Sequence, residues 1–85
     1  MKARAAYELI VAREGRGPAL FAAPDRVDRV EVVEIVSGES VLFWELEPRA
    51  ASRLARALRE DLGRLEADAF IAAWRAAQER ERGER

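Results

Sequence analysis

Few side chains in this sequence could act as a nucleophile or exchange a proton near neutral pH. The chain has no cysteine, no histidine and no threonine. Enzymes need groups that attack or titrate near pH 7. The remaining hydroxyl and amino groups are Ser37, Ser40, Ser52, Tyr7 and Lys2. Without cysteine or histidine, disulfides, thiolate chemistry and the usual zinc sites are excluded, and we expect a protein that is not an enzyme.

Carboxylates are the remaining candidates for catalysis or for a metal site with oxygen ligands. Glu31, Glu34, Glu45 and Glu47 fall in or beside expected strands. We expect them to face solvent and not to converge as an acid–base pair. The sequence also lacks the loop pattern of a calcium site. The prediction is therefore no catalytic residue, no metal and no cofactor.

Glycine and proline cluster once, at residues 14–18, in the sequence Glu-Gly-Arg-Gly-Pro. A phosphate loop requires Gly-Lys-Ser/Thr at the start of a helix, and a dinucleotide fingerprint requires a third glycine. Neither pattern occurs here. Residues 14–18 are therefore predicted to form a hairpin turn.

The charge of the chain is nearly balanced, with 15 basic and 16 acidic residues and a net charge of -1. A nearly neutral chain lacks the excess of positive charge that typically binds duplex nucleic acid or an anionic membrane. Single-stranded nucleic-acid binding, in which bases stack on aromatic rings beside basic groups, is the alternative function. The residues that would serve it are Arg49, Arg53, Arg56, Tyr7 and Trp44. A solvated arginine face and core packing of the rings are the favoured interpretations.

Patterns of period two predict strands at residues 4–13, 19–23, 29–36 and 41–46. The first of these is rich in alanine, so a helix over residues 2–13 is its alternative. In the third, Glu31 and Glu34 have opposite parity, which predicts a bulge near Val32 and Val33. The loop at 37–40 contains Gly38, at a position suited to a positive φ angle.

A helical pattern begins at Pro48, which suits the first helical position, with Glu47 as its N-cap. The first apolar stripe of this pattern contains Leu54, Leu58, Leu62 and Leu65, with Ala51 and Ala55. A second stripe contains Phe70, Ile71 and Trp74, with Ala67 and Ala77.

On one straight helix, at about 100° per residue, the two stripes would point in nearly opposite directions. One outcome is a break between Leu62 and Asp68, with Gly63 ending the first helix and Asp68 capping the second. The other is one continuous helix that presents its second stripe to a partner.

These elements predict an α+β fold. It consists of a four-stranded antiparallel β-meander followed by one long or two short C-terminal helices packed on one sheet face (ββββα or ββββαα). Residues 1–78 would form a single domain, and residues 79–85 a charged, disordered tail. The longest apolar runs are too short to span a membrane, and no signal peptide precedes the first strand, so we expect a cytoplasmic protein. The absence of asparagine and threonine is typical of a GC-rich coding sequence or of a hot growth environment.

The strand at 41–46 is apolar on both faces. Leu42, Trp44 and Leu46 share one face, and Val41 and Phe43 share the other. Since one helical layer covers one face only, the second face predicts a small interaction or regulatory module that forms a homodimer. The expected partner is a second copy of the chain or another protein. The candidate interface residues are Val41, Phe43, Phe70, Ile71 and Trp74.

Overall fold

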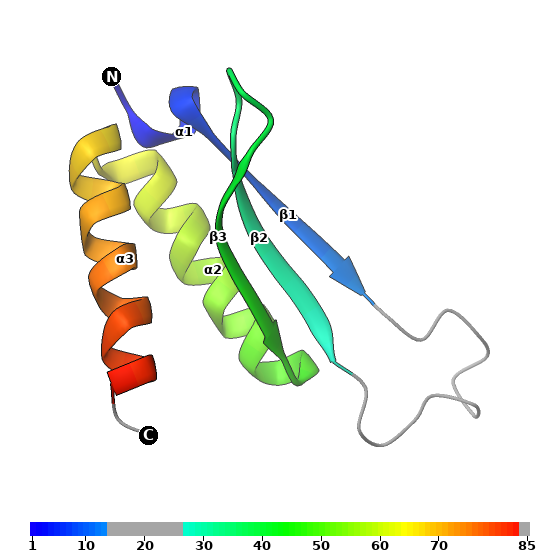
Figure 1. The fold of residues 1–85 in the computed structure, drawn as a ribbon. Helices are drawn as coiled ribbons and strands as arrows, with labels where there is room; N and C mark the ends of the chain where they lie inside the picture. The colour runs from blue at the N-terminus through cyan, green and yellow to red at the C-terminus, as the bar shows by residue number, and fades with distance from the viewer. Residues whose placement is uncertain (14–26, 84–85) are drawn as a thin grey trace.

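The computed structural model of the chain describes residues 1–13 and 27–83 and shows an antiparallel sheet with helices on one of its faces (Figure 1). The elements in chain order are α1 (Ala3–Ala6), β1 (Tyr7–Arg13), β2 (Asp28–Glu34), β3 (Ser40–Leu46), α2 (Pro48–Arg64) and α3 (Ala67–Gly83). The predicted α+β class is confirmed. Over the described ranges, no helix is long and apolar enough to cross a membrane.

The sheet of the described residues has three strands in the order β1-β2-β3. β1 pairs directly with β2 from Tyr7↔Glu34 to Arg13↔Asp28. The predicted strand at 19–23 lies outside the described residues. β1 and β2 are neighbours along their whole length, and the predicted four-stranded meander is not confirmed.

The N-terminal segment combines the two predicted alternatives. Ala3–Ala6 form the single helical turn α1, and the strand begins at Tyr7, not at residue 4. Ala3 is fully buried, and its N–H donates to the carbonyl of Leu65 at 3.0 Å. A methyl side chain permits this close backbone approach, and alanine favours a helical turn over a strand.

The predicted bulge occurs at the predicted level of the sheet but on the opposite strand. Val32 pairs with Leu42 and Val33 with Ser40, so Val41 of β3 is the extra residue. β2 itself alternates regularly, and Glu34 lies at its end, where its carboxylate accepts a hydrogen bond from Ser37 at 2.7 Å. A polar side chain at the end of a strand reaches solvent, so β2 needs no bulge.

Gly38 closes the β2–β3 hairpin with a φ angle of 75°, as predicted. Glycine populates this left-handed region without the steric cost that a Cβ atom brings.

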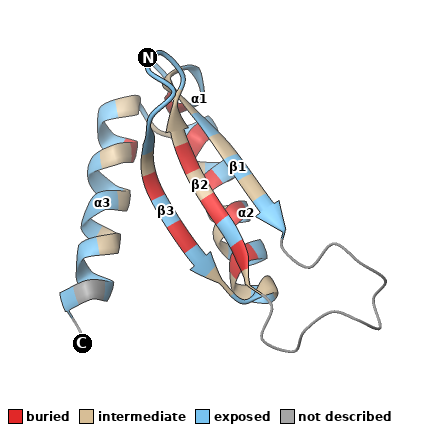
Figure 2. Cartoon of the chain, turned by 45° about the vertical axis from the view of Figure 1, so that its right-hand side comes forward, coloured by how far each residue is buried: buried red, intermediate tan, exposed pale blue. Residues whose placement is uncertain are grey.

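The core lies between the sheet and α2, which lies behind the strands in the view of Figure 2. Buried positions alternate with more exposed ones along β2 and β3 (Figure 2). The predicted α2 stripe is confirmed, because Ala51, Ala55, Leu58 and Leu62 are buried. The strand residues that share this core are Val30, Val32, Leu42 and Trp44.

The helical segment is divided into two helices, which is one of the two predicted outcomes. α2 ends at Arg64, Leu65 is extended with φ -94° and ψ 155°, and α3 begins at Ala67. Gly63 lies inside α2 and Asp68 inside the first turn of α3, so neither has the capping role predicted for it.

Backbone pairing with the N-terminus fixes the position of this break. Lys2 and Glu66 form an antiparallel bridge, and the N–H of Ala67 donates to the carbonyl of Met1 at 2.9 Å. The Lys2 ammonium also donates to the carbonyl of Arg64 at 3.1 Å and so satisfies one of the free carbonyls at the end of α2.

α3 extends further than its apolar residues do. Residues 79–83, predicted as part of a disordered tail, continue the helix to Gly83. This stretch consists of Glu, Arg, Glu, Arg and Gly. Its charged residues are good helix formers, so helical structure does not require an apolar face here.

Glu47 caps the N-terminus of α2, as predicted. Its carboxylate accepts hydrogen bonds from the N–H groups of Ala50 at 2.7 Å and of Arg49 at 3.2 Å. These two bonds favour the charged form and lower the pKa of Glu47 below its ordinary value of 4.5.

Replacing Glu47 by alanine should lower the thermal midpoint of unfolding at pH 7, because two N–H groups lose their acceptor. Since the folded-state pKa is lowered, the stabilisation is complete above the unfolded-state pKa and is lost as the pH falls through the folded-state pKa. The difference in midpoint between the wild type and E47A should therefore shrink below pH 4.5. E60A, which removes an exposed carboxylate further along α2, is the matched control in circular-dichroism melts. A difference that stays constant down to pH 2.5 would contradict this role.

Candidate interaction surface

One face of the sheet carries no helix of the described structure (Figure 2). The strand register assigns eight side chains to this open face, which we define as Glu8, Ile10, Ala12, Arg29, Glu31, Val33, Phe43 and Glu45. Alternation along the strands directs these side chains away from α2.

Two large apolar side chains lie on the open face. Ile10 is 41% exposed and Phe43 is 45% exposed. Both flank Glu31 in one cross-strand row, since Ile10 pairs with Glu31 on one side and Phe43 pairs with Glu31 on the other. Ile35 and Val36 in the β2–β3 hairpin are also exposed, and Val36 is 94% exposed. The chain therefore presents apolar surface along the sheet and at the hairpin.

The charges of the open face are mainly negative. Glu8, Glu31 and Glu45 contribute three carboxylates, and Arg29 contributes one guanidinium. Arg29 and Glu45 are cross-strand partners with their charged atoms 3.8 Å apart, and both side chains are about half exposed. Exposed pairs of this kind contribute about 0–1 kcal/mol, so they shape specificity more than stability.

Helix α3 borders the open face along β3. The side-chain amide of Gln78 donates to the backbone carbonyl of Phe43 at 2.8 Å. A shallow hollow of about 170 Å³ lies at this border and is lined by Ser40, Val41, Leu42, Phe43 and Gln78. Val41 is half-buried and packs against the core, so of this predicted pair Phe43 is the side chain that faces solvent.

The structure places the rest of the predicted interface elsewhere. Phe70 is fully buried and stacks on Tyr7, with ring centroids 5.7 Å apart. Trp74 packs edge-on against Trp44 at 6.0 Å. Its indole N–H donates to the carboxylate of Asp61 at 3.1 Å. Ile71 is half-buried against the same core. The second apolar stripe thus folds back onto its own chain, and its three residues do not join Phe43 on one surface.

The residues predicted for nucleic-acid binding are also not brought together. Tyr7 and Trp44 pack on the covered face of the sheet, where they contact Phe70 and Trp74. Arg49, Arg53 and Arg56 are exposed on α2. No aromatic platform with these arginines beside it results.

Ile10, Val33, Ile35 and Val36 were not among the predicted interface residues. Ile10 carried a usable signal, because it is apolar at a position of opposite parity to Leu9 and Val11. Val33 has the opposite parity to the buried Val30 and Val32, so a regular β2 directs it to the open face. The predicted bulge at Val32 and Val33 hid this signal, because the bulge lies on β3.

Metal binding has no geometric basis in the part of the chain that the structure describes, where no three acidic, histidine or cysteine residues form a group that could hold an ion. Comparison with protein-family models, with curated proteins and with solved structures found no match to this chain.

Introducing a charge at Trp74 should destabilise the single chain. Trp74→Glu removes two aromatic contacts and the hydrogen bond to Asp61, at a cost of about 3 kcal/mol, the lower end for loss of a large aromatic. Urea unfolding should show this loss at every protein concentration, because the contacts are within one chain. A73E, at an exposed position of the same helix, should change stability little. A destabilisation of W74E that disappears at low protein concentration and grows as the concentration rises would instead make Trp74 an interface residue.

Proposed function

We propose that the protein is a small interaction module that self-associates into a homodimer through the open face of its sheet. The row formed by Ile10, Glu31 and Phe43 carries this proposal, since it exposes two large apolar side chains on a face with no helical cover in the described structure. Exposed apolar patches of this kind typically mark protein-binding surfaces.

The size of the open face limits how the dimer can form. Three strands spaced about 4.8 Å apart, each seven residues long at about 3.3 Å per residue, span on the order of 300 Å² in projection. A standard interface buries about 800 Å² on each partner. The hairpin residues Ile35 and Val36 supply additional apolar surface next to this face, and we include them in the interface.

Charge restricts where a twofold axis can lie. A residue on the axis meets its own copy in the partner. Two Glu31 carboxylates would repel each other, whereas two Phe43 rings can pack favourably. We therefore locate the axis beside Phe43, so that Glu31 lies next to the axis without meeting its own copy and Glu8 lies toward the rim. A face of modest area that carries acidic residues predicts a weak dimer, favoured by raised ionic strength.

The decisive experiment measures mass against concentration for the wild type and for Phe43→Lys. Analytical ultracentrifugation from about 1 μM to 1 mM, the range in which a weak dimer dissociates, should show reversible dimerisation of the wild type. F43K should stay monomeric, because two lysines would meet at the axis. A72K, at an exposed position of α3, is the matched control and should dimerise like the wild type.

Two results would contradict the homodimer. One is a wild type that stays monomeric over the whole range of concentrations. The other is an F43K variant that dimerises as strongly as A72K, since that would locate the interface on another surface. Circular dichroism of both variants checks that each is folded.

A further inference from the structure

The outer edge of β1 presents backbone groups that pair with no other strand of the described residues. The carbonyl of Ala6 accepts from the N–H of Ile35 at 2.9 Å, which fixes the side of β1 that bonds to β2. In an antiparallel pair the bonding residues alternate, so the N–H and C=O groups of Leu9 and Val11 point away from β2. Within residues 1–13 and 27–83, no other strand lies along this edge. The opposite edge of the sheet differs, since α3 approaches β3 there and Gln78 bonds to Phe43.

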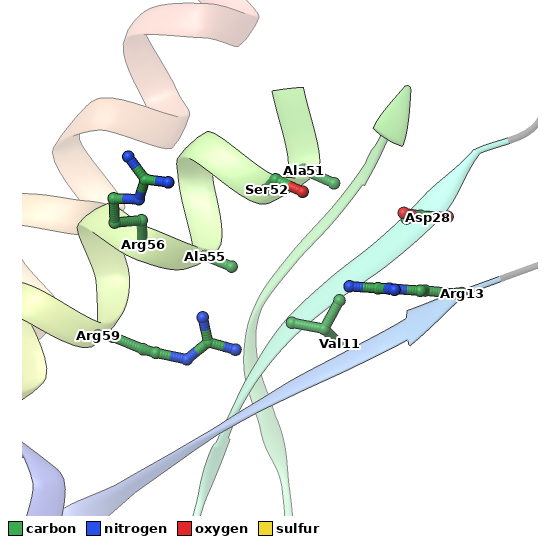
Figure 3. Close-up of a pocket in the computed structure, with 8 residues that line it drawn as sticks. All are labelled: Val11, Arg13, Asp28, Ala51, Ser52, Ala55, Arg56 and Arg59. Atoms are coloured by element: carbon green, nitrogen blue, oxygen red, sulfur yellow. The ribbon is translucent and has the colours of Figure 1, made fainter. Parts of the chain in front are cut away.

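A groove of about 440 Å³ lies between the end of β1 and α2 (Figure 3). Its apolar wall consists of Val11 on β1 and of Ala51 and Ala55 on α2. The two alanines are small, so the helix leaves room above the strand at this point. The groove is thus continuous with the strand whose edge is free, because Val11 belongs to both.

Three arginines line the same groove. Arg13 comes from the end of β1, and Arg56 and Arg59 come from α2. In Figure 3 the side chains of Arg13 and Arg59 extend into the space between the strand and the helix, and Arg56 extends away from the sheet. None of the three makes a hydrogen bond or an ion pair with another described residue. Asp28 is the single carboxylate among the described residues of the lining, and it is buried at the sheet end of the groove.

Among the described residues of the lining, three guanidinium groups against one carboxylate give the groove a positive potential. Guanidinium groups bind carboxylates through paired, charge-assisted hydrogen bonds. An extended peptide that adds to a free sheet edge receives its affinity from backbone hydrogen bonds and its specificity from alternate side chains. The groove and the edge together therefore fit one kind of ligand.

We propose that β1 and α2 bind an extended acidic peptide of a partner protein, which adds to the sheet as a strand beside β1. Its backbone bonds to Leu9 and Val11. Every second side chain points into the groove, where the carboxylates meet Arg13 and Arg59 and their methylene groups rest on Val11 and Ala55. This site lies apart from the open face of the sheet, so it is independent of the proposed homodimer.

The test measures fluorescence polarisation of labelled seven-residue peptides with the full chain. A peptide that alternates glutamate and valine should bind, and a peptide that alternates lysine and valine should not. Binding should weaken with added salt, since the charges are partly exposed. Reversing the charge in Arg59→Glu should raise the dissociation constant about tenfold or more. R80E, which changes an exposed arginine of α3, is the matched control and should bind like the wild type.

Strand addition is tested separately from charge. Val11→Pro removes an outward N–H without breaking the ladder to β2, a position at which edge strands accept proline. If V11P does not fold, a glutamate–valine peptide with N-methylated backbone nitrogens makes the same test from the ligand, and it should bind at least about tenfold more weakly. F43K should keep peptide binding and R59E should keep dimerisation, so that failure of one proposal is distinguished from failure of the other.

Three outcomes would overturn the peptide site. The first is no binding of the acidic peptide at low salt. The second is equal binding of the N-methylated peptide together with competition by inorganic phosphate at similar concentration, which would show a simple anion site without strand addition. The third is binding that R59E and R80E weaken equally, which would show a general electrostatic attraction.

Discussion

The reversal of the chain at Leu65 and Glu66 decides how this molecule covers its sheet. The two apolar stripes of the helical half point in nearly opposite directions on a straight helix, so only a turn between them lets both reach the same core. Backbone bonds from Ala3 to Leu65 and from Ala67 to Met1 hold that turn. The consequence is the burial of Phe70 between Tyr7 and Trp74, which completes the core beyond the reach of α2. A buried aromatic of this size contributes about 1.5–3 kcal/mol, a substantial part of the stability of a small domain.

The sequence predicted those features that depend on neighbouring residues. The N-cap at Glu47, the positive φ of Gly38 and the buried stripe of α2 all follow from local chemistry and helical spacing. The break in the helix was predicted from the phase of its two stripes, but its position was not. That position depends on hydrogen bonds to the first three residues, which lie about sixty positions earlier in the chain. The direct pairing of β1 with β2 was not predicted for the same reason, since it is a non-local contact.

The candidate surfaces were predicted only in part. Phe43 was identified because the parity of its strand placed it opposite Trp44. Phe70 and Trp74 were assigned to the same interface because an apolar stripe looks alike whether it meets another chain or its own. The arginine groove could not be seen in the sequence at all, because Arg13 and Arg59 approach each other only when α2 crosses the sheet. Folding thus separates the charges of a nearly neutral chain into an acidic sheet face and a basic groove.

The hydrogen bond from Gln78 to the Phe43 carbonyl has a consequence for the stoichiometry of assembly. A sheet with two free edges can add molecules at both ends, and such growth leads to fibres of indefinite length. Here α3 approaches β3 through Gln78 and obstructs one of the two edges. Within the described residues, the outer edge of β1 is then the one open strand edge, so growth by the proposed strand addition ends once that edge is filled. In the kinetics of such growth, α3 acts as a terminator. The molecule can therefore keep one open strand edge without polymerising.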